Sequence, residues 1–347
     1  MSEQLLSVQE LAVSFQTEEG SVTAVDGVSL ELAPGEILAV VGESGSGKSV
    51  TAMTLMGLTR SPNATFHGEA TYRGTELVSA DDETLRKVRG AEIAMIFQDP
   101  MTSLNPVQKI GHQIEEQILV HMDVEKTEAR ERAIELLERV GIPRARDRVD
   151  SYPHEFSGGM RQRVMIALAL SCDPNLLIAD EPTTALDVTI QAQILDRIRA
   201  LRDETGTAVI LVTHDLGVVA DIADRVAVMY AGRIVEQGTL DEIFYDPQHP
   251  YTWGLLGSIA RVDRDRPDRL PAIAGLPPSL ANRPPGCHFA PRCPHKFDKC
   301  EQTPHLEQRA GETPGHLDRC WLDGDAKREL RVVEGQIGLE SPREGVA

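Results

Sequence analysis

The sequence predicts an α/β fold in which a parallel β-sheet is covered by helices on both faces. Two observations carry this prediction. Short apolar runs typical of buried strands recur at residues 37–41, 93–97, 176–179, 209–212 and 226–229. A helical segment at residues 190–202, with Ile194, Ile198 and Leu201 on one face, joins the third run to the fourth. Repeated strand–helix–strand units of this kind form right-handed parallel sheets.

Size and composition favour two structural units. The chain has 347 residues, of which 41% are hydrophobic, enough for a sizeable core. Its formal net charge of −19 argues against a nucleic-acid-binding surface, which needs clustered Lys and Arg. No run approaches the roughly 18 apolar residues of a membrane span, and the N-terminus lacks the regions of a secretory signal. We therefore expect a cytosolic chain that meets a membrane only through a partner.

Changes in pattern along the chain divide it into domains. The first segment looks antiparallel, because Val28, Leu30 and Leu32 alternate with polar residues. An acidic, helical segment at residues 114–140 looks like a separate subdomain. Proline becomes frequent after Asp246, and the polar chain from Asp323 is expected to form a poorly ordered tail. The predicted units are a nucleotide-binding domain (residues 1–245, with a helical subdomain at about 99–170), a C-terminal extension (246–325) and a tail (326–347).

A glycine-rich loop with the sequence GESGSGKS occupies residues 42–49, between the apolar run at residues 37–41 and a plausible helix at residues 50–58. A strand, a glycine-rich loop and a helix follow one another in this order in phosphate-binding loops. The glycines let backbone N–H groups point at one anion, and the helix N-terminus adds partial positive charge. Lys48 would reach the β- and γ-phosphates, and the Ser49 hydroxyl would bind Mg²⁺. We expect this chain to bind a nucleoside triphosphate.

Two carboxylates, Asp180 and Glu181, follow the apolar run at residues 176–179. The carboxyl ends of strands are where ligands bind in open α/β sheets. Asp180 would hold Mg²⁺ through water, and Glu181 would orient and deprotonate the water that attacks the γ-phosphate. The alternative is an acidic pair that only stabilises a helix start.

Two further polar residues follow apolar runs. His214 could hydrogen-bond the γ-phosphate and position the attacking water, and Gln98 could contact Mg²⁺ or that water. Each could equally be an ordinary polar residue in a loop.

A second candidate anion site is the helix start at Ser157-Gly158-Gly159, ahead of a helical run at residues 164–170. Ser157 is a natural N-cap, and the two glycines expose backbone N–H groups. Simple N-capping accounts for the serine but not for the pair of glycines.

These motifs, in this order, resemble the nucleotide-binding subunits of ATP-binding cassette (ABC) transporters over about residues 5–238. Residues 42–49 match the Walker A motif, 176–181 Walker B with the catalytic glutamate, Gln98 the Q-loop, His214 the switch histidine and residues 185–187 the D-loop. The resemblance implies a RecA-like parallel sheet, an antiparallel β subdomain and a helical subdomain. It also implies an ATP site formed by Phe15, Gly42, Ser44, Gly45, Ser46, Gly47, Lys48, Ser49, Val50, Asp180, Ser157, Gly158, Gly159 and Asp187. Phe15 would stack on adenine, Mg²⁺ would meet Ser49, Gln98 and Asp180, and catalysis would use Glu181, His214, Lys48 and Gln98.

The helix start at residues 157–159 is similar to the family's signature motif, although Phe156 and Met160 stand where Leu and Gln are common. In the family, two subunits sandwich two ATP molecules, and the signature of one chain faces the Walker A loop of the other. The resemblance therefore implies that an isolated chain hydrolyses ATP poorly.

Residues 98–106, 156–163, 249–252 and the extension at residues 271–320 look like the dipeptide/oligopeptide and nickel importer branch. This resemblance implies an ATPase that powers peptide import, with nickel as the alternative solute. The implied partners are two transmembrane permease subunits, a second and different ATP-binding subunit and an extracytoplasmic binding protein, at the cytoplasmic face of the cell membrane. A soluble ABC protein acting on nucleic acid or the ribosome is the rival hypothesis. Its usual coiled coil, second cassette and basic surface are missing from the sequence.

Four of the five cysteines, Cys287, Cys293, Cys300 and Cys320, lie in the C-terminal extension. Their spacing matches neither a ferredoxin run nor paired zinc knuckles, and a cytosolic compartment disfavours disulfides. An iron–sulfur cluster, a zinc ion with help from His288 or His295, and four free thiols all stay open on the residues alone. Some members of the peptide-importer branch are understood to carry a [4Fe–4S] cluster at such a cysteine set, so the resemblance favours the cluster.

Overall fold

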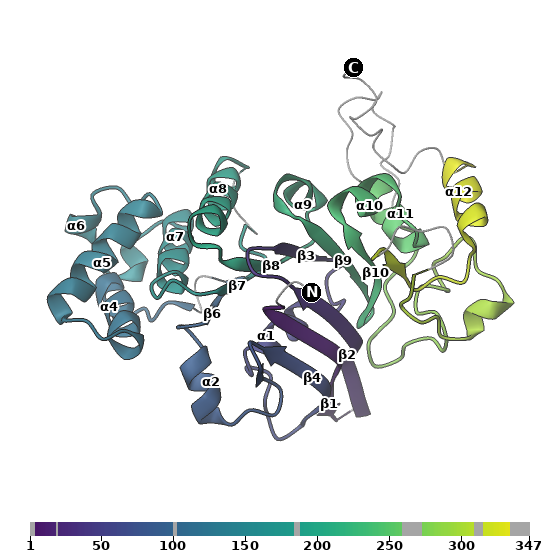
Figure 1. Cartoon of the computed structure of the whole chain (residues 1–347), viewed down its shortest axis with the longest axis horizontal. Coiled ribbons are helices and arrows are strands. Elements are labelled where there is room, and N and C mark those ends of the chain that lie inside the picture. The colour runs from purple at the N-terminus through teal and green to yellow at the C-terminus, as the bar shows by residue number, and fades with distance from the viewer. Residues whose placement is uncertain are drawn as a thin grey trace, which may run out of the picture.

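The computed structural model describes residues 4–18, 20–99, 103–183, 188–258, 273–308 and 315–333. Its described strands form two sheets, one with four strands in the order β2-β1-β4-β5 and one with seven in the order β11-β10-β9-β3-β8-β7-β6. The four-stranded sheet lies on one side of the seven-stranded sheet, and helices α8, α9 and α10 lie on the other (Figure 1). The predicted α/β fold class is confirmed, but one face of the central sheet is covered by a second sheet and the helix between them rather than by helices alone.

The strands are β1 (Leu6–Thr17), β2 (Gly20–Leu32), β3 (Ile37–Val41), β4 (Ala64–Tyr72), β5 (Thr75–Glu76), β6 (Ile93–Ile96), β7 (Leu176–Asp180), β8 (Ala208–Thr213), β9 (Arg225–Tyr230), β10 (Arg233–Thr239) and β11 (Leu317–Asp318).

The helices are α1 (Lys48–Leu55), α2 (Asp82–Val88), α4 (Ile110–His121), α5 (Lys126–Arg139), α6 (Ala145–Arg148), α7 (Gly158–Ala169), α8 (Val188–Thr205), α9 (Leu216–Ile222), α10 (Leu240–Tyr245), α11 (Pro250–Gly257) and α12 (Gly324–Val333), with short 3₁₀ turns at Pro153–Glu155 and Asp298–Glu301. Among these described helices, none combines the length and the apolarity needed to cross a bilayer.

The centre of the seven-stranded sheet is parallel. Strand β3 pairs in parallel with β8 and β9, and β7 pairs in parallel with β8 and β6. These strands are buried almost throughout, because helices or the second sheet cover both faces, and their sequences are correspondingly continuous apolar runs. Strands β10 and β11 extend the sheet as antiparallel additions.

The four-stranded sheet is antiparallel, as predicted for its N-terminal strands, with β1 paired to β2 and to β4. Strand β4 gave no clear signal in the sequence, and the structure supplies the reason. The register of the β1–β4 pair shifts between Gln9 and Ala12, and Gly68 lies there with a positive φ of 82°. The extra residue of this bulge lies in β1, so β4 keeps its alternation, but Ala64, Gly68 and Ala70 on the face of Phe66 and Tyr72 are small and give a weak hydrophobic period.

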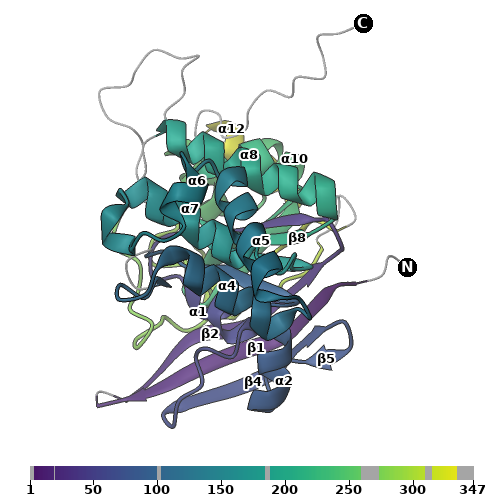
Figure 2. The ribbon, with the colours of Figure 1, turned by 90° about the vertical axis from the view of Figure 1, so that its left-hand side faces the viewer.

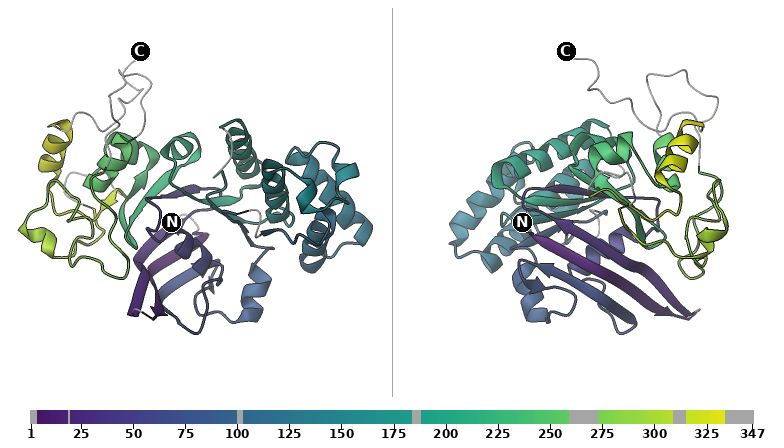
Figure 3. Two further views of the ribbon diagram at one scale, coloured as in Figure 1. Left: turned by 180° about the vertical axis from the view of Figure 1, so that it is seen from behind. Right: turned by 45° about the vertical axis from the view of Figure 1, so that its right-hand side comes forward.

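Two groups of elements lie at opposite ends of the central sheet. Helices α4 to α7 gather beside the edge strand β6, and the C-terminal extension lies beyond β10 at the opposite end, as Figures 1 and 3 both show. Figure 2 looks onto the helical group from its own side, with the long strands β1, β2 and β4 behind and below it. Helix α1 packs between the two sheets, against β2, β7 and β8.

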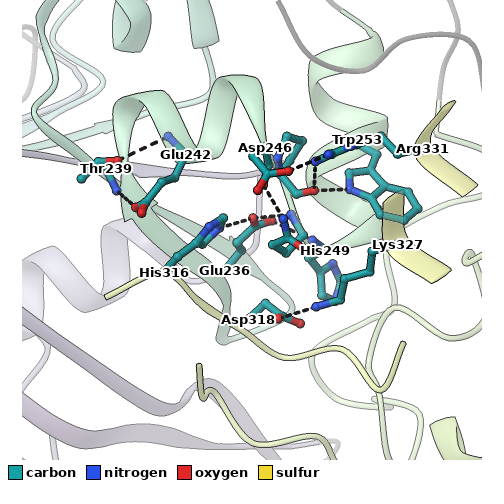
Figure 4. Close-up of polar contacts among 12 residues, drawn as sticks. Glu236, Thr239, Glu242, Asp246, His249, Trp253, His316, Asp318, Lys327 and Arg331 are labelled. Atoms are coloured by element: carbon teal, nitrogen blue, oxygen red, sulfur yellow. Dashed lines mark hydrogen bonds and ion pairs between the residues drawn. The ribbon is translucent and has the colours of Figure 1, made fainter. Parts of the chain in front are cut away.

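A buried polar network joins the extension to the cassette (Figure 4). The carboxylate of Glu236 on β10 accepts the backbone N–H groups of Gln248 at 2.6 Å and His249 at 2.9 Å, and it lies 2.8 Å from Nε2 of His316. These side chains are at most 4% exposed. A buried carboxylate is tolerated here because several donors surround it.

The expectation of a poorly ordered tail from Asp323 is wrong for its first part, where helix α12 forms. Its polar residues are paired with groups that the local sequence does not contain. Lys327, 1% exposed, contacts the Asp318 carboxylate at 2.6 Å, and Arg331 contacts Asp246 at 2.6 Å. Tertiary contacts therefore fold a segment whose composition indicates disorder.

Candidate active site

The predicted site residues meet at one edge of the central sheet. Strands β6, β7, β8 and β3 are neighbours and run in parallel, so their carboxyl ends lie together. Gln98 follows β6, Asp180 ends β7, His214 follows β8, and the glycine-rich loop at residues 42–49 follows β3. One sheet edge thus brings together residues from position 42 to position 214 of the sequence.

The glycine-rich loop needs its glycines for close packing against neighbouring backbone. A Cβ atom on Gly42 would lie 2.1 Å from the carbonyl oxygen of Met229, and one on Gly47 would lie 2.5 Å from that of Ala24. Gly47 also has a φ of 103°, which favours glycine. The backbone of Ser46 is held from outside the loop, because the Gly232 N–H donates to its carbonyl at 2.9 Å.

Lys48 points back into the loop. Its ammonium group donates to the carbonyl oxygens of Gly42 at 2.8 Å and Glu43 at 3.0 Å, and the residue is 4% exposed. Burial lowers the pKa of Lys48, against the opposing effect of the nearby Glu181, Asp180 and Glu43 carboxylates. The Ser46 hydroxyl is also buried and has no hydrogen-bond partner among the described residues. An anion in the loop would meet both groups.

Ser49 and Asp180 form the candidate magnesium site. The Ser49 hydroxyl donates to the Asp180 carboxylate at 3.0 Å, and Asp180 is 4% exposed. Burial raises the pKa of Asp180, while the Ser49 hydrogen bond and the Lys48 charge act in the other direction. Hydroxyl and carboxylate oxygens are ligands that Mg²⁺ prefers, so this donor pair fits the ion.

Glu181 is the centre of a second set of contacts. Its carboxylate accepts a hydrogen bond from Nε2 of Gln98 at 2.8 Å and lies 3.2 Å from Nδ1 of His214. The residue has a φ of 47°, in the left-handed region, and its N–H donates to the Val212 carbonyl at 2.8 Å. Strained backbone of this kind occurs often at functional sites. The structure thus brings together three residues that the sequence could only place after three separate strands.

The signature motif lies on the outer surface at the start of α7. Ser157 accepts the Met160 N–H at 3.4 Å as an N-cap, and Ser157 and Gly158 are exposed. A Cβ atom on Gly158 would meet nothing within 4 Å, so the fold of this chain does not itself require glycine there. The side chain of Gln162, further along α7, donates to the Pro182 carbonyl and so links this helix to the segment after Glu181.

The other predicted nucleotide contacts are partly described. Phe15 lies on β1, half-buried against the core between the sheets. The D-loop at residues 185–187, including Asp187, lies outside the described residues, as do residues 100–102 after Gln98.

The four late cysteines line one cavity. Cys287, Cys293, Cys300 and Cys320 surround it together with His249 and His295, among other residues. Burial raises the pKa of the Cys287 and Cys320 thiols. His288, in contrast, is not among the lining residues: its Nδ1 lies 3.1 Å from the Ala231 carbonyl. Among the described residues no group of three or more His, Cys, Asp or Glu side chains is arranged to hold a single metal ion.

Sequence reasoning missed two residues beside the loop. Arg292 and Tyr251, from the C-terminal part of the chain, both contact Glu43, the second residue of the loop. No spacing or motif in the sequence links these segments, which lie more than 200 residues apart, so only the folded chain reveals the contact.

Comparisons with known proteins agree with this architecture. Residues 25–184 match the family model described as ABC transporter, and residues 235–300 match the model described as the C-terminal region of oligopeptide/dipeptide transporters. Among solved structures, the dimeric ATP-binding cassette MJ0796 in a post-hydrolysis state with ADP and Pi is 27% identical, with a TM-score of 0.62 over 68% of this chain and 98% of that chain. The protein is an ABC ATPase with a region beyond the cassette.

Curated relatives extend the likeness to that region. The oligopeptide transport ATP-binding protein OppD of Bacillus subtilis is 54% identical over 92% of this chain and 88% of its own length. The dipeptide transport ATP-binding protein DppD of the same organism is 51% identical over 96% of this chain and 98% of its own length. The chain belongs to the family of ATP-binding proteins of oligopeptide and dipeptide ABC transporters, which confirms the predicted family.

Proposed function

We propose that this chain powers the import of dipeptides or oligopeptides through a membrane transporter. The observation that carries the proposal is the likeness over nine-tenths of the chain to peptide-transport ATP-binding proteins, including the C-terminal region that a plain cassette lacks. The chain would work with two permease subunits, a second and different ATP-binding subunit and an extracytoplasmic binding protein. It would sit at the cytoplasmic face of the cell membrane, bound to the permeases.

The glycine-rich loop would hold the triphosphate of ATP. The role of Lys48 is supported by its buried ammonium group, which could exchange its two loop carbonyls for β- and γ-phosphate oxygens. Mg²⁺ would be held by Ser49, Asp180 and Gln98, and it would neutralise charge on the phosphates. Phe15 would stack on the adenine ring, and the N–H groups of residues 44–50 would face the phosphates.

Glu181 would act as the base in hydrolysis. Its carboxylate would take a proton from the water that attacks the γ-phosphate, while Gln98 and His214 hold that carboxylate and the water in line. The proposal is supported by the two contacts of the carboxylate, one at each of its oxygens. Lys48 would stabilise the charge on the transferring phosphoryl group.

A second ATP-binding subunit would complete the site. Ser157, Gly158 and Gly159 would bind the γ-phosphate held by the partner, and the partner's signature motif would face the loop of this chain. The exposure of Ser157 and Gly158 supports this role. Asp187 would contribute at the same interface. ATP would close the pair of subunits, and hydrolysis would reopen it.

The cysteine-lined cavity would hold a [4Fe–4S] cluster through Cys287, Cys293, Cys300 and Cys320. Support comes from the donor set, since four thiols facing one cavity are the ligands such a cluster uses. Protein purified without oxygen should be brown and should release iron and sulfide. Colourless protein with one equivalent of zinc would favour the zinc alternative, and metal-free protein would favour four reduced thiols.

Assembly of the complete transporter tests the transport function. The chain would be purified with its permease and partner ATPase and reconstituted in vesicles with the binding protein. We expect peptide, delivered by the binding protein, to raise ATP turnover. Stimulation by nickel alone would assign the chain to nickel import. Copurification with ribosomes or DNA in place of membrane subunits would favour a soluble ABC ATPase, which the net charge of −19 opposes.

A further inference from the structure

The C-terminal extension forms hydrogen bonds with Glu43, the second residue of the glycine-rich loop. Arg292 lies between Cys287 and Cys293, and its guanidinium donates two hydrogen bonds to the Glu43 carboxylate, at 2.6 Å to Oε2 and 3.0 Å to Oε1. The Arg292 side chain is 5% exposed and that of Glu43 is 28% exposed. Paired, parallel hydrogen bonds of this kind fix the direction of a carboxylate as well as its charge.

The backbone of Glu43 is held as well. Its N–H donates to the phenol oxygen of Tyr251 at 2.9 Å, and Tyr251 is fully buried on α11. Tyr230, at the end of β9, supports both contacts: its ring lies 4.5 Å from that of Tyr251 and 5.8 Å from the Arg292 guanidinium, measured to the centroid. Phe289 packs against both tyrosine rings. A packed aromatic cluster therefore supports the two residues that contact Glu43.

The charge of Glu43 matters because of where it lies. The carboxylate acts electrostatically on the Lys48 ammonium, and the Glu43 carbonyl accepts a hydrogen bond from it. A carboxylate this close to the phosphate-binding lysine would repel the triphosphate that the lysine attracts. Arg292 supplies the compensating positive charge, and its guanidinium is itself held by the Tyr230 hydroxyl, to which it donates at 3.4 Å.

We propose that Arg292 is a positioning residue for the nucleotide site: by neutralising Glu43 and fixing its direction, it lets the C-terminal extension set the affinity of the glycine-rich loop for ATP. The inference rests on the proposed role of that loop in holding the triphosphate. It gives the extension a task in the ATPase cycle in addition to whatever its cysteines bind.

Titration of the full chain with Mg-ATP tests the proposal. Arg292→Gln leaves Glu43 uncompensated, so we expect the dissociation constant to rise by about tenfold. The double variant Arg292→Gln with Glu43→Gln removes the repelling carboxylate too, and we expect its affinity to return to within about twofold of the wild type. A purely structural role for Arg292 predicts no such rescue, because the second substitution removes a further contact.

Arg331→Gln provides a matched control. Arg331 on α12 also pairs with a carboxylate, but with that of Asp246 beyond α10 rather than with one in the loop (Figure 4). We expect its Mg-ATP affinity to equal that of the wild type. Thermal unfolding of each variant would verify folding.

Two results would overturn the inference: wild-type affinity in Arg292→Gln, or equally weak binding by the single and double variants. Failure of the proposed function looks different. In that case the wild type would not bind Mg-ATP, or Lys48→Ala would bind it as tightly as the wild type does.

Discussion

Glu181 illustrates how single residues are held at this site. Its left-handed backbone turns the chain sharply at the end of β7, and its carboxylate is held between Gln98 and His214. A non-glycine residue pays about 1–3 kcal/mol for such a conformation, which persists only where the surroundings enforce it. The strand pairing of its N–H with the Val212 carbonyl is part of that enforcement.

Replacement of this base should separate binding from hydrolysis. We expect Glu181→Gln to retain the hydrogen bond geometry and the affinity for Mg-ATP. Turnover by the assembled ATPase should fall by about 10²–10⁴-fold, because the amide cannot accept the proton of the attacking water. Phosphate release measured beside nucleotide titration checks both parts. Undiminished turnover would show that another group is the base.

A second residue-scale effect concerns acid. Burial, reinforced by the nearby Lys327 ammonium, lowers the pKa of His249 to about 3. The unfolded state binds a proton near the ordinary pKa of 6.5, so the folded state loses stability as the pH falls below that value. Between pH 7 and pH 5 the loss from His249 is about 2 kcal/mol. Asn at this position could still accept the Tyr251 N–H that His249 caps, without titrating.

We therefore expect His249→Asn to lose less stability than the wild type when the pH is lowered from 7 to 5. Urea unfolding followed by tryptophan fluorescence at both pH values measures the difference. Trp253 is buried on α11, which His249 caps. His288, whose pKa burial lowers to about 4, is present in both proteins, so its contribution cancels. Equal losses in the two proteins would contradict the assignment.

At the scale of elements, helix α12 depends on a buried ion pair. Lys327 and Asp318 are 1% and 0% exposed, and each neutralises the other. Breaking a buried pair costs about 3–5 kcal/mol because one charge stays behind in the interior, whereas replacing both partners costs less. The pair thus decides whether a polar segment docks on strand β11 of the extension.

Substitution of one partner should release this helix. We expect Lys327→Met to destabilise the extension by about 3–5 kcal/mol, and Lys327→Met with Asp318→Asn to be closer to the wild type. Both tryptophans, Trp253 and Trp321, lie in the C-terminal part of the chain, so their fluorescence follows unfolding there. A single variant as stable as the wild type would mean that α12 is held by other contacts.

For the whole molecule, the sequence predicted the fold class and placed most residues of the candidate site directly after strands of the sheet. Continuous apolar runs revealed the parallel strands, and the residues after them proved to share one sheet edge because parallel neighbours end together. Strand β4 was not predicted because small residues on its less exposed face give a weak hydrophobic period. Helix α12 was not predicted because its polar residues pair with groups outside the local sequence. The contact between Arg292 and Glu43 could not be predicted either, because contacts between distant segments produce no periodic pattern in the sequence.

Assembly is the other property of the whole molecule. Gly158 is exposed and has open space around its Cβ position, so Gly158→Arg should fold normally and bind Mg-ATP in the isolated chain as the wild type does. In the assembled pair the arginine would occupy the position proposed for the partner's γ-phosphate contact, and turnover should fall by about a hundredfold. Calorimetric titration of the isolated chain and phosphate release by the complex measure the two effects. Normal turnover in the complex would refute the proposed interface.

Strand β11 has a consequence for any shortened form of the protein. Its two residues pair with Glu236 and Gln237 on β10. Without β11, this part of β10 would be an exposed edge strand of the central sheet. Exposed edge strands have unpaired N–H and C=O groups that pair with strands of other molecules and promote aggregation. A chain that ends after residue 258 would expose this edge of β10 and would leave the Glu236 carboxylate without His316. We therefore expect the shortened chain to aggregate more than the 347-residue chain does. Light scattering of the two forms at equal concentration measures whether the extension protects the protein from aggregation.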